Sequence, residues 1–493
     1  MLTISEIAQF ISEDATSDKK RLARVGQDYY EGKHDILSYR LFYYDTDGEL
    51  QEDTTRSNIK IPHPFFTELV DQQVQYMLSG EGYIVKSDIP ELQNELDAYF
   101  NENEDFSAEL YELLTDAVTK GFAYMYAYKN EDDKTAFQCA DSLGVVEVRA
   151  RDTDDGCDYV IYWYIDRIEK GHKKIKRIQV WDSANTYFYV QDGEGNITED
   201  TDAPHNPRPH TLFKQGGKDT TYYENFGFIP FFRLDNGKKQ TSGLKCVKDL
   251  IDDYDLMASS LSNNLVDFDT PLYVVTGFQG DDLSELQQNL KTKKMIGVPE
   301  NGNGVDVKTV DVPFQARQVK LALDEVNIYR FGMGFNSAQI GDGNITNVVI
   351  KSRYALLDLK CNKLEIRLKQ FMRKIIKIVL EEINDANGTD YQLKDVYFDF
   401  ERQVMTNAHD NASIDHVKAQ TEQVKINTLL NLAGALDNET IVKGICEILD
   451  LDYEELKDKL PKDEATETEA AVAAAGGIVV DEQAAKGSNT IPA

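Results

Sequence analysis

The feature that most constrains this chain is a long apolar seam between residues 348 and 383. Its members recur at alternating steps of four and three, which places them on one face of a helix. The seam positions are Ile350, Tyr354, Leu357, Cys361, Leu364, Leu368, Phe371, Ile375 and Ile378. No Gly or Pro interrupts the run, and at ~1.5 Å per residue such a helix is roughly 50 Å long. The fold must therefore cover one face of a very long helix.

A second seam lies upstream, in a helical pattern that runs from Ser242 to about Asp267, and a third helical pattern follows Pro313. The positions of the second seam are Leu244, Val247, Ile251, Tyr254, Ala258, Leu261 and Leu265. Two interpretations fit this periodicity. The long helices either form the core of one subunit or pack side by side around a ring of subunits.

A small insert separates the helical pattern that ends near Asp267 from the one that follows Pro313. It has strand patterns at Leu272–Gly277 and Val305–Val310, and a short helix is expected at Leu283–Leu290. A further strand begins at Lys291 and ends near Pro299. Its basic triplet, unusual in an acidic chain, is Lys291, Lys293 and Lys294. These lysines either protect an edge strand from pairing with another chain or contact a phosphate or a partner.

A polar loop, residues 341–347, separates the helical pattern that follows Pro313 from the long one that begins at Val348. It carries Gly341, Asp342 and Gly343, and no Lys or Arg occurs from Met333 to Val349. Neutral polar groups can touch a phosphate backbone without holding it tightly, and Gly permits hinge-like motion. The segment is either a loop that follows a moving ligand or an ordinary linker.

The composition excludes several classes of protein. A chain of 493 residues exceeds one core, so we expect two to four domains. A net charge of −33 disfavours tight nucleic-acid binding by the whole protein, although it does not exclude a passive conduit for DNA. The five scattered cysteines form no CxxC pair, so no disulfide framework or zinc site is expected, and Cys246 and Cys361 are interpreted as small core residues. Neither a signal peptide nor a membrane span is predicted.

The first 241 residues have an α+β pattern. A helical region from Ile4 to Glu31 comes first, and an extended segment, Asn58–Phe66, leads into another helix. Further helices are expected near Ile89–Asn101 and Phe106–Lys120. Alternating strands are predicted at Phe122–Tyr128, Val145–Arg149, Tyr159–Ile168, Ile175–Trp181 and Thr186–Val190. The polar stretch Thr198–Lys218 is expected to be a loop.

The last 110 residues divide into three parts. Tyr397–Glu401 has a strand pattern that can rejoin the sheet, and Ala412–Leu460 is helical. From Pro461 the chain is rich in Glu, Ala and Gly, so we expect a largely disordered acidic tail. The fold class predicted for the whole chain is therefore α+β.

No catalytic motif accompanies these elements. The chain has no GxxxxGK[ST], HExxH, GxSxG or GxGxxG pattern. His34 is interpreted as a satisfied surface histidine. The acidic groups at Asp252, Asp253 and Asp255 could suggest a two-metal nuclease. Adjacent carboxylates on a helix point about 100° apart, so these are better explained as solvated helix faces. No catalytic residue, metal site or cofactor is predicted.

Two sequence blocks, in this order and spacing, carry a resemblance to a known family. The first contains Tyr29–Ile36, Asn58–Phe66 and Leu69–Gln72. The second contains Ile229–Phe232 followed by Val247–Asp255. The chain resembles the portal proteins of tailed bacteriophages, in particular siphophages of Gram-positive hosts, from about residue 4 to residue 460.

The resemblance implies a dodecameric ring at one capsid vertex, with double-stranded DNA passing through its centre. The implied parts are a wing (1–241), a stem helix (242–267), a clip (268–312), a second stem helix (313–332), a tunnel loop (333–347), a tunnel helix (348–384), a wing return strand (385–404), a crown (405–460) and an acidic tail (461–493). The tunnel-loop residues expected to face DNA are Asn336, Ser337, Gln339, Gly341, Asp342, Gly343, Asn344, Thr346 and Asn347.

The implied partners all belong to phage assembly. They are the terminase large subunit, a head-completion or adaptor protein, the major capsid protein and a scaffolding protein. The clip, with Lys291, Lys293 and Lys294, would contact the motor or the adaptor. No membrane is involved, and the protein is expected in the virion and, during assembly, in the host cytoplasm. The alternatives are an acidic scaffold or minor capsid protein without a channel and, on the Asp clusters, a metal-dependent nuclease.

Overall fold

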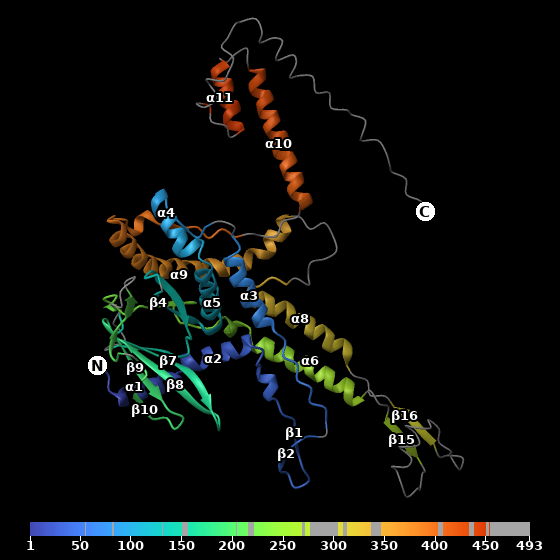
Figure 1. The fold of residues 1–493 in the computed structure, drawn as a ribbon. Helices are drawn as coiled ribbons and strands as arrows, with labels where there is room; N and C mark the ends of the chain where they lie inside the picture. Colours follow the sequence, from blue (N-terminus) through green and yellow to red (C-terminus); the bar gives the residue numbers. More distant parts are fainter. Residues whose placement is uncertain are drawn as a thin grey trace, which may run out of the picture. The chain divides into compact units, whose positions relative to one another are not determined.

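The structure is a computed structural model that forms two compact units, Met1–Met405 and Thr406–Ala493 (Figure 1). Each unit is described separately. The structure describes residues 1–54, 56–80, 83–130, 132–149, 156–203, 205–214, 221–268, 272–276, 304–308, 313–336, 347–402, 408–432, 438–449 and 453. The mixture of helices and antiparallel strands in the first unit confirms the α+β class.

The core of the first unit lies between three helices and a small sheet. The helices are α3 (Phe65–Met77), α5 (Glu104–Lys120) and α9 (Asn347–Asn387), and their apolar faces share one cluster of buried residues. The sheet has the strand order β14-β4-β5, with bounds Phe231–Asp235, Phe122–Lys129 and Thr135–Ala140. Both α5 and α9 pack against this sheet.

Helix α9 shows whether its apolar seam packs within one subunit or between subunits. It has 41 residues, so it is longer than the seam required. The buried seam positions are Leu357, Cys361, Leu364, Leu368, Phe371, Ile375 and Ile378. They pack into the core of their own subunit, so the interpretation as a single-subunit core is correct for α9. A face that is already covered cannot also be a contact between subunits.

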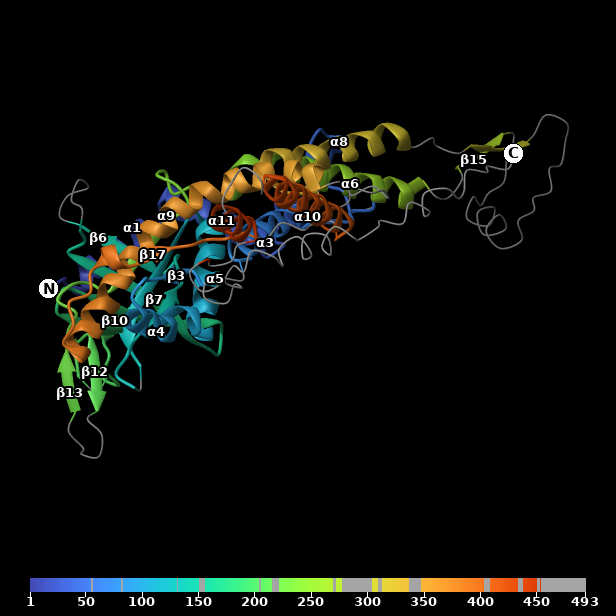
Figure 2. The same cartoon turned by 90° about the horizontal axis from the view of Figure 1, so that it is seen from above.

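Two further helices form a pair. After a 3₁₀ turn (η3, Gly243–Cys246), α6 runs from Lys248 to Phe268. Helix α8 (Phe314–Gly332) lies beside it (Figure 2). The seam predicted between Ser242 and Asp267 is buried at Leu244, Val247 and Ile251 but exposed at Leu265. Only its first half therefore faces the core. Cys246 is exposed, which makes its interpretation as a core residue wrong.

A larger antiparallel sheet completes the first unit. Its strand order is β10-β9-β8-β7-β6, and β11 (Arg208–Pro209) pairs with β9. The strand bounds are Val145–Val148 (β6), Tyr159–Glu169 (β7), Lys173–Trp181 (β8), Asn185–Gln191 (β9) and Ile197–Glu199 (β10). All of the strands predicted in this region are confirmed. The helix α1 packs on the sheet through Ile7, which is fully buried.

Several local predictions need correction. The helical region 4–31 is two helices, α1 (Ile4–Thr16) and α2 (Asp18–Tyr30), because Ser17 is extended and its hydroxyl accepts the N–H of Lys20 as an N-cap. The stretch 198–218 is not simply a loop, since it contains β11 and β12 (Thr211–Lys214), which pairs with β13 (Thr221–Glu224). A hairpin, β1 (Phe42–Tyr44) and β2 (Leu50–Glu52), was not predicted at all.

The region between α3 and α5 was predicted more closely. It contains β3 (Val85–Lys86), α4 (Pro90–Leu96) and one π-helical turn, Asp97–Asn101. The strand predicted at 397–401 exists as β17 (Tyr397–Phe398), but it pairs with β3 in a separate ladder and does not rejoin a larger sheet.

Both strand patterns at the ends of the insert are confirmed. β15 (Leu272–Thr276) and β16 (Gly304–Lys308) pair antiparallel. The short helix predicted at 283–290 and the strand predicted at 291–299 lie outside the described residues.

The second unit is helical, as predicted. It contains α10 (Ala408–Asn431) and α11 (Asn438–Ile448), which pack against each other. Gly444 allows this close approach, because a Cβ at that position would lie 3.0 Å from a methyl carbon of Leu429. The acidic tail from 461 lies outside the described residues. None of the described helices has the length and apolar character needed to span a bilayer.

Candidate functional site

The described chain stops at both ends of the predicted DNA-facing loop. Asn336 is the last described residue before it, and Asn347 is the first residue of α9 after it. The Asn336 side chain donates to the Glu325 carboxylate at 3.0 Å. The other predicted loop residues, Ser337, Gln339, Gly341, Asp342, Gly343, Asn344 and Thr346, lie outside the described residues, and so do Lys291, Lys293 and Lys294. What the structure defines is how the loop is attached.

The chain leaves α8 through a tight left-handed turn. Met333 adopts φ 56°, and the N–H of Gly334 donates to the carbonyl of Tyr329 at 2.9 Å. A non-Gly residue in this conformation is strained by roughly 1 kcal/mol. A Cβ on Gly334 would lie 2.2 Å from a methyl carbon of Leu69 on α3. Only Gly fits there, because the turn is pressed directly against α3.

A side-chain amide then holds the backbone of the next residue. The N–H of Phe335 donates to Oε1 of Gln72 at 2.9 Å, and Nε2 of Gln72 donates to the carbonyl of Phe335 at 2.8 Å. The same nitrogen also donates to Glu68. Both backbone groups of Phe335 are thus satisfied by α3, which fixes the position at which the loop begins.

Aromatic rings connect this point to the far side of the loop. The Phe335 ring stacks on Tyr354 with centroids 4.8 Å apart and planes 19° from parallel. Tyr354 lies on α9 and also contacts Tyr76 of α3 at 5.4 Å. The residue before the loop therefore touches the second turn of the helix after it. We call Gln72, Phe335, Tyr354 and Tyr76 the loop anchor.

The loop anchor also has a short polar contact to α8. The Tyr329 hydroxyl donates to the carboxylate of Glu68. Burial and this hydrogen bond raise the pKa of Tyr329 well above its usual range. The hydroxyl therefore remains a donor throughout the physiological pH range, and the loop anchor contains no group that titrates there.

A second polar cluster lies where α6 meets the N-terminal helices. Asp255, whose side chain is fully buried, accepts from Nδ1 of His34 at 2.6 Å and from Nδ1 of His63 at 2.8 Å. It also accepts the backbone N–H of His63 at 2.9 Å. Burial alone would raise the pKa of Asp255, but the hydrogen bonds from the two imidazoles outweigh it and lower the pKa. We call His34, His63 and Asp255 the stem-base cluster.

This cluster overturns two predictions. His34 is fully satisfied but buried and not at the surface, and Asp255 is not on a solvated helix face. The other ring nitrogen of His34 lies 3.2 Å from the carbonyl of Tyr29. Both ring nitrogens of His34 therefore lie within hydrogen-bond distance of an oxygen acceptor.

The neighbouring carboxylates, Asp252 and Asp253, are half-buried and do not lie on a fully solvated helix face. Asp252 is bonded by the Tyr29 hydroxyl and by Lys248, whereas Asp253 pairs with Lys320 on α8. They point to different partners and do not share an ion. Within the described part of the chain, no group of three or more His, Cys, Asp or Glu side chains is arranged to hold a metal ion.

In both clusters, each polar group described above binds another group of the same chain and braces a helix or a loop. The chain belongs to the family described as "Phage portal protein, SPP1 Gp6-like", which it matches over residues 9–476. The family is structural and not enzymatic, which confirms that prediction. Its members are virion components that form oligomeric assemblies.

Two curated relatives carry the name "Portal protein". The protein of Bacillus phage SPP1 is 26% identical over 369 residues, which cover 74% of this chain and 71% of the relative. The protein of Clostridium phage phiCD119 is 24% identical over 437 residues, which cover 84% of this chain and 89% of the relative. Both matches span most of each protein, so the similarity extends well beyond one domain.

Proposed function

We propose that twelve copies of this chain form a ring around a channel at one vertex of a phage capsid. Double-stranded DNA enters and leaves through the channel without sequence-specific contacts. The observation that carries the proposal is the family match over residues 9–476. The net charge of −33 fits this role, because an acidic wall offers few phosphate anchors and favours sliding.

The parts of the ring are assigned in the same proposal. The wing is 1–241 with its return segment 385–404, the stem helices are 242–267 and 313–332, the clip is 268–312, the tunnel loop is 333–347, the tunnel helix is 348–384, the crown is 405–460 and the tail is 461–493. This assignment is supported by α6, α8 and α9 occupying the stem and tunnel-helix ranges.

The tunnel loop would touch DNA at the narrowest point of the channel. Its side chains between Met333 and Val349 include no cation, so contact with phosphates is weak and neutral. The loop anchor supports this role, because a loop that follows DNA needs fixed ends. Phe335 is held by Gln72 and stacks on Tyr354, so the start of the loop is fixed.

The clip and the crown would bind the other assembly proteins. The clip docks the terminase large subunit during packaging and an adaptor protein afterwards, with Lys291, Lys293 and Lys294 as contact residues. ATP hydrolysis belongs to the terminase. The crown faces the capsid interior, where the major capsid protein and the scaffolding protein assemble around the ring in the host cytoplasm.

Negative-stain electron microscopy together with the mass in solution tests the ring. Rings with a central hole and a mass near twelve subunits are expected. A compact oligomer without a hole would overturn the proposal and favour an acidic scaffold or minor capsid protein. Because rings of this type can need a partner to nucleate, a monomeric preparation is examined again with the scaffolding protein present, and failure to form rings there counts against the proposal.

The mobility of the tunnel loop has its own test. Replacing Gly341 and Gly343 together by Pro removes backbone freedom, so DNA packaging should stop while ring assembly continues. The matched Gly341→Ala, Gly343→Ala variant restricts the backbone less and should package at an intermediate level. Normal packaging by the Pro variant would show that the loop does not need to move.

A further inference from the structure

The proposed ring does not specify which surfaces of neighbouring copies contact each other. The long seam of α9 is excluded, because its side chains are buried in their own subunit. Among the apolar surfaces that the described part of the first unit exposes, two are of interest here. One lies on the hairpin β1–β2 and the other on α8.

The first surface is one face of the hairpin. In the antiparallel register Tyr44 lies opposite Leu50, and Phe42 lies opposite Glu52. Directly opposite residues, and residues two apart on a strand, share a face. Phe42, Tyr44 and Leu50 therefore form one apolar patch, with exposed fractions of 50%, 73% and 56%. We call these three residues the hairpin face.

The hairpin receives little support from its own chain. All six of its strand residues are exposed, and Figure 1 shows it extending away from the helices. A two-stranded hairpin alone is marginally stable in water. Its internal ties are an Arg40–Glu52 ion pair at 3.1 Å and an Asp45 carboxylate that caps the turn. The aromatic face of the hairpin is exposed in the subunit and is therefore available to pack against another protein surface.

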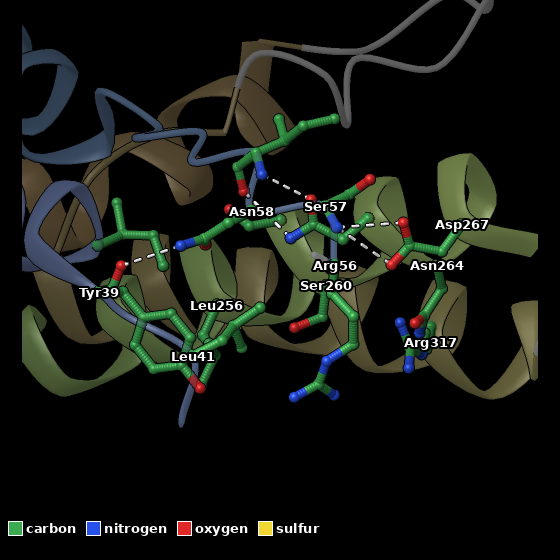
Figure 3. Close-up of a pocket in the computed structure, with 14 residues that line it drawn as sticks. Tyr39, Leu41, Arg56, Ser57, Asn58, Leu256, Ser260, Asn264, Asp267 and Arg317 are labelled. Atoms are coloured by element: carbon green, nitrogen blue, oxygen red, sulfur yellow. Dashed lines mark hydrogen bonds between the residues drawn. The ribbon is translucent and has the colours of Figure 1, made fainter. Parts of the chain in front are cut away.

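The root of the hairpin, by contrast, is fixed to α6. The N–H of Ser57 donates to the Asp267 carboxylate, and the N–H of Ile59 donates to Oδ1 of Asn263 at 2.6 Å. Figure 3 shows this root, where Tyr39 and Asn58 are joined by a hydrogen bond beside a 260 Å³ pocket next to α6 and α8. A fixed root and an uncovered tip make the hairpin a pre-oriented arm.

The second surface lies on α8. Val319, Leu323 and Val326 are spaced four and three apart, so they line one side of the helix. Their exposed fractions are 69%, 55% and 42%. The buried residues of α8 are Asp324, Ile328, Tyr329 and Gly332. We call Val319, Leu323 and Val326 the α8 face.

The two surfaces differ in charge. The exposed charged residues between Phe42 and Glu52 are all acidic, namely Asp47, Glu49 and Glu52. On α8 the exposed charged residue is Arg330, one turn beyond Val326. Opposite charges around an apolar contact favour one orientation and disfavour contact of each surface with a copy of itself.

We propose that the hairpin face of each copy packs on the α8 face of the neighbouring copy. The inference rests on the ring proposed above. Two different surfaces of one chain that fit each other make a head-to-tail contact, which closes into a ring when the rotation permits. Each copy then supplies one arm and receives one, so every hairpin is covered. The exposed aliphatic side chains on α8 suit a protein partner better than a phosphate backbone.

Cross-linking distinguishes this contact from other arrangements. Tyr44→Cys and Leu323→Cys are combined in a Cys246→Ser background, which removes the exposed natural thiol. Assembled rings are treated with a short flexible bis-maleimide and analysed on denaturing gels. We expect a ladder of covalent oligomers that extends to the full ring.

The single variants provide the matched controls. Rings assembled from an equal mixture of the Tyr44→Cys chain and the Leu323→Cys chain should give covalent dimers and no higher product, and each chain alone should give none. Dimers from Leu323→Cys alone would indicate helix-to-helix contact between neighbours and overturn the inference.

The outcomes separate this inference from the proposed function. Rings that show a central hole but yield monomer, or a link within one chain, would overturn the hairpin contact and leave the ring intact. A preparation of the unmodified chain that forms no ring with its scaffolding protein would overturn the ring itself, and the inference with it.

Discussion

The stem-base cluster and the loop anchor fix two parts of the same unit by different means. At the stem base, a buried carboxylate binds two imidazoles, Asp255 with His34 and His63. At the loop anchor, a neutral amide and stacked rings hold Phe335. The first depends on the buried carboxylate of Asp255, whose pKa is lowered by its hydrogen bonds. The second is weaker and is built from neutral groups.

The largest expected effect comes from breaking the stem-base cluster. Asp255→Asn removes the buried carboxylate that accepts hydrogen bonds from His34 and His63, and a hydrogen bond to a charged group contributes about 1.5–3 kcal/mol. The free energy of unfolding, measured in urea, should fall by that amount. Asp249→Asn on the same helix is the control, since Asp249 is exposed, and it should cost less than about 1 kcal/mol. Equal effects of the two changes would contradict a special role for Asp255.

The same cluster predicts an acid sensitivity. The pKa of Asp255 is lower in the folded chain, while an unfolded Asp has a pKa of about 3.9. Its stabilisation is therefore complete above about pH 4 and is lost as the pH falls through the lower folded pKa. The difference in unfolding free energy between the native chain and Asp255→Asn should shrink as the pH falls below about 4. A difference that stays constant down to pH 3 would contradict the lowered pKa.

These two regions also show what could be read from the sequence. Helix α9 and the strands β6, β7, β8 and β9 of the large sheet were predicted correctly, because their periodicity is local. The stem-base cluster was missed, because His34 and Asp255 are 221 positions apart and neither residue carries a local signal of burial. A polar residue next to a turn, such as His34, is equally consistent with solvent.

The loop anchor was missed for a related reason. The sequence located the Gly-rich loop, but nothing around Gln72 marks it as the partner of Phe335, 263 positions away. The hairpin β1–β2 did have a local signal. Asp47-Gly48 is a turn dipeptide between Phe42–Tyr44 and Leu50–Glu52, and Gly48 adopts φ 79°. The hairpin was not predicted, although this turn dipeptide is a local signal for it. The dipeptide gives no signal for the exposed aromatic face.

The effect expected at the loop anchor is smaller. Gln72→Ala leaves the N–H and the carbonyl of Phe335 without their partners, which should cost about 1–3 kcal/mol. Hydrogen-exchange mass spectrometry should show faster exchange in peptides that contain Phe335 and little change elsewhere. Gln75→Ala is the control, because Gln75 is exposed on the same helix. The loss should be the same at pH 5 and pH 7, in contrast to the acid sensitivity of Asp255, and a pH-dependent loss would contradict the neutral character of the anchor.

The smallest effect is expected from the aromatic stack of Phe335 on Tyr354, two residues on opposite sides of the loop in the sequence. Phe335→Leu and Tyr354→Leu each remove the stacked pair while keeping apolar volume, and a double-mutant cycle isolates their interaction. An offset stack with centroids 4.8 Å apart should give a coupling of about 0.5–1.5 kcal/mol in urea unfolding. If the loop works between fixed ends, either substitution should slow DNA packaging more than it destabilises the fold. A measurable coupling with unchanged packaging would mean that Gln72 alone fixes the loop, and the stack then only fills space between α8 and α9.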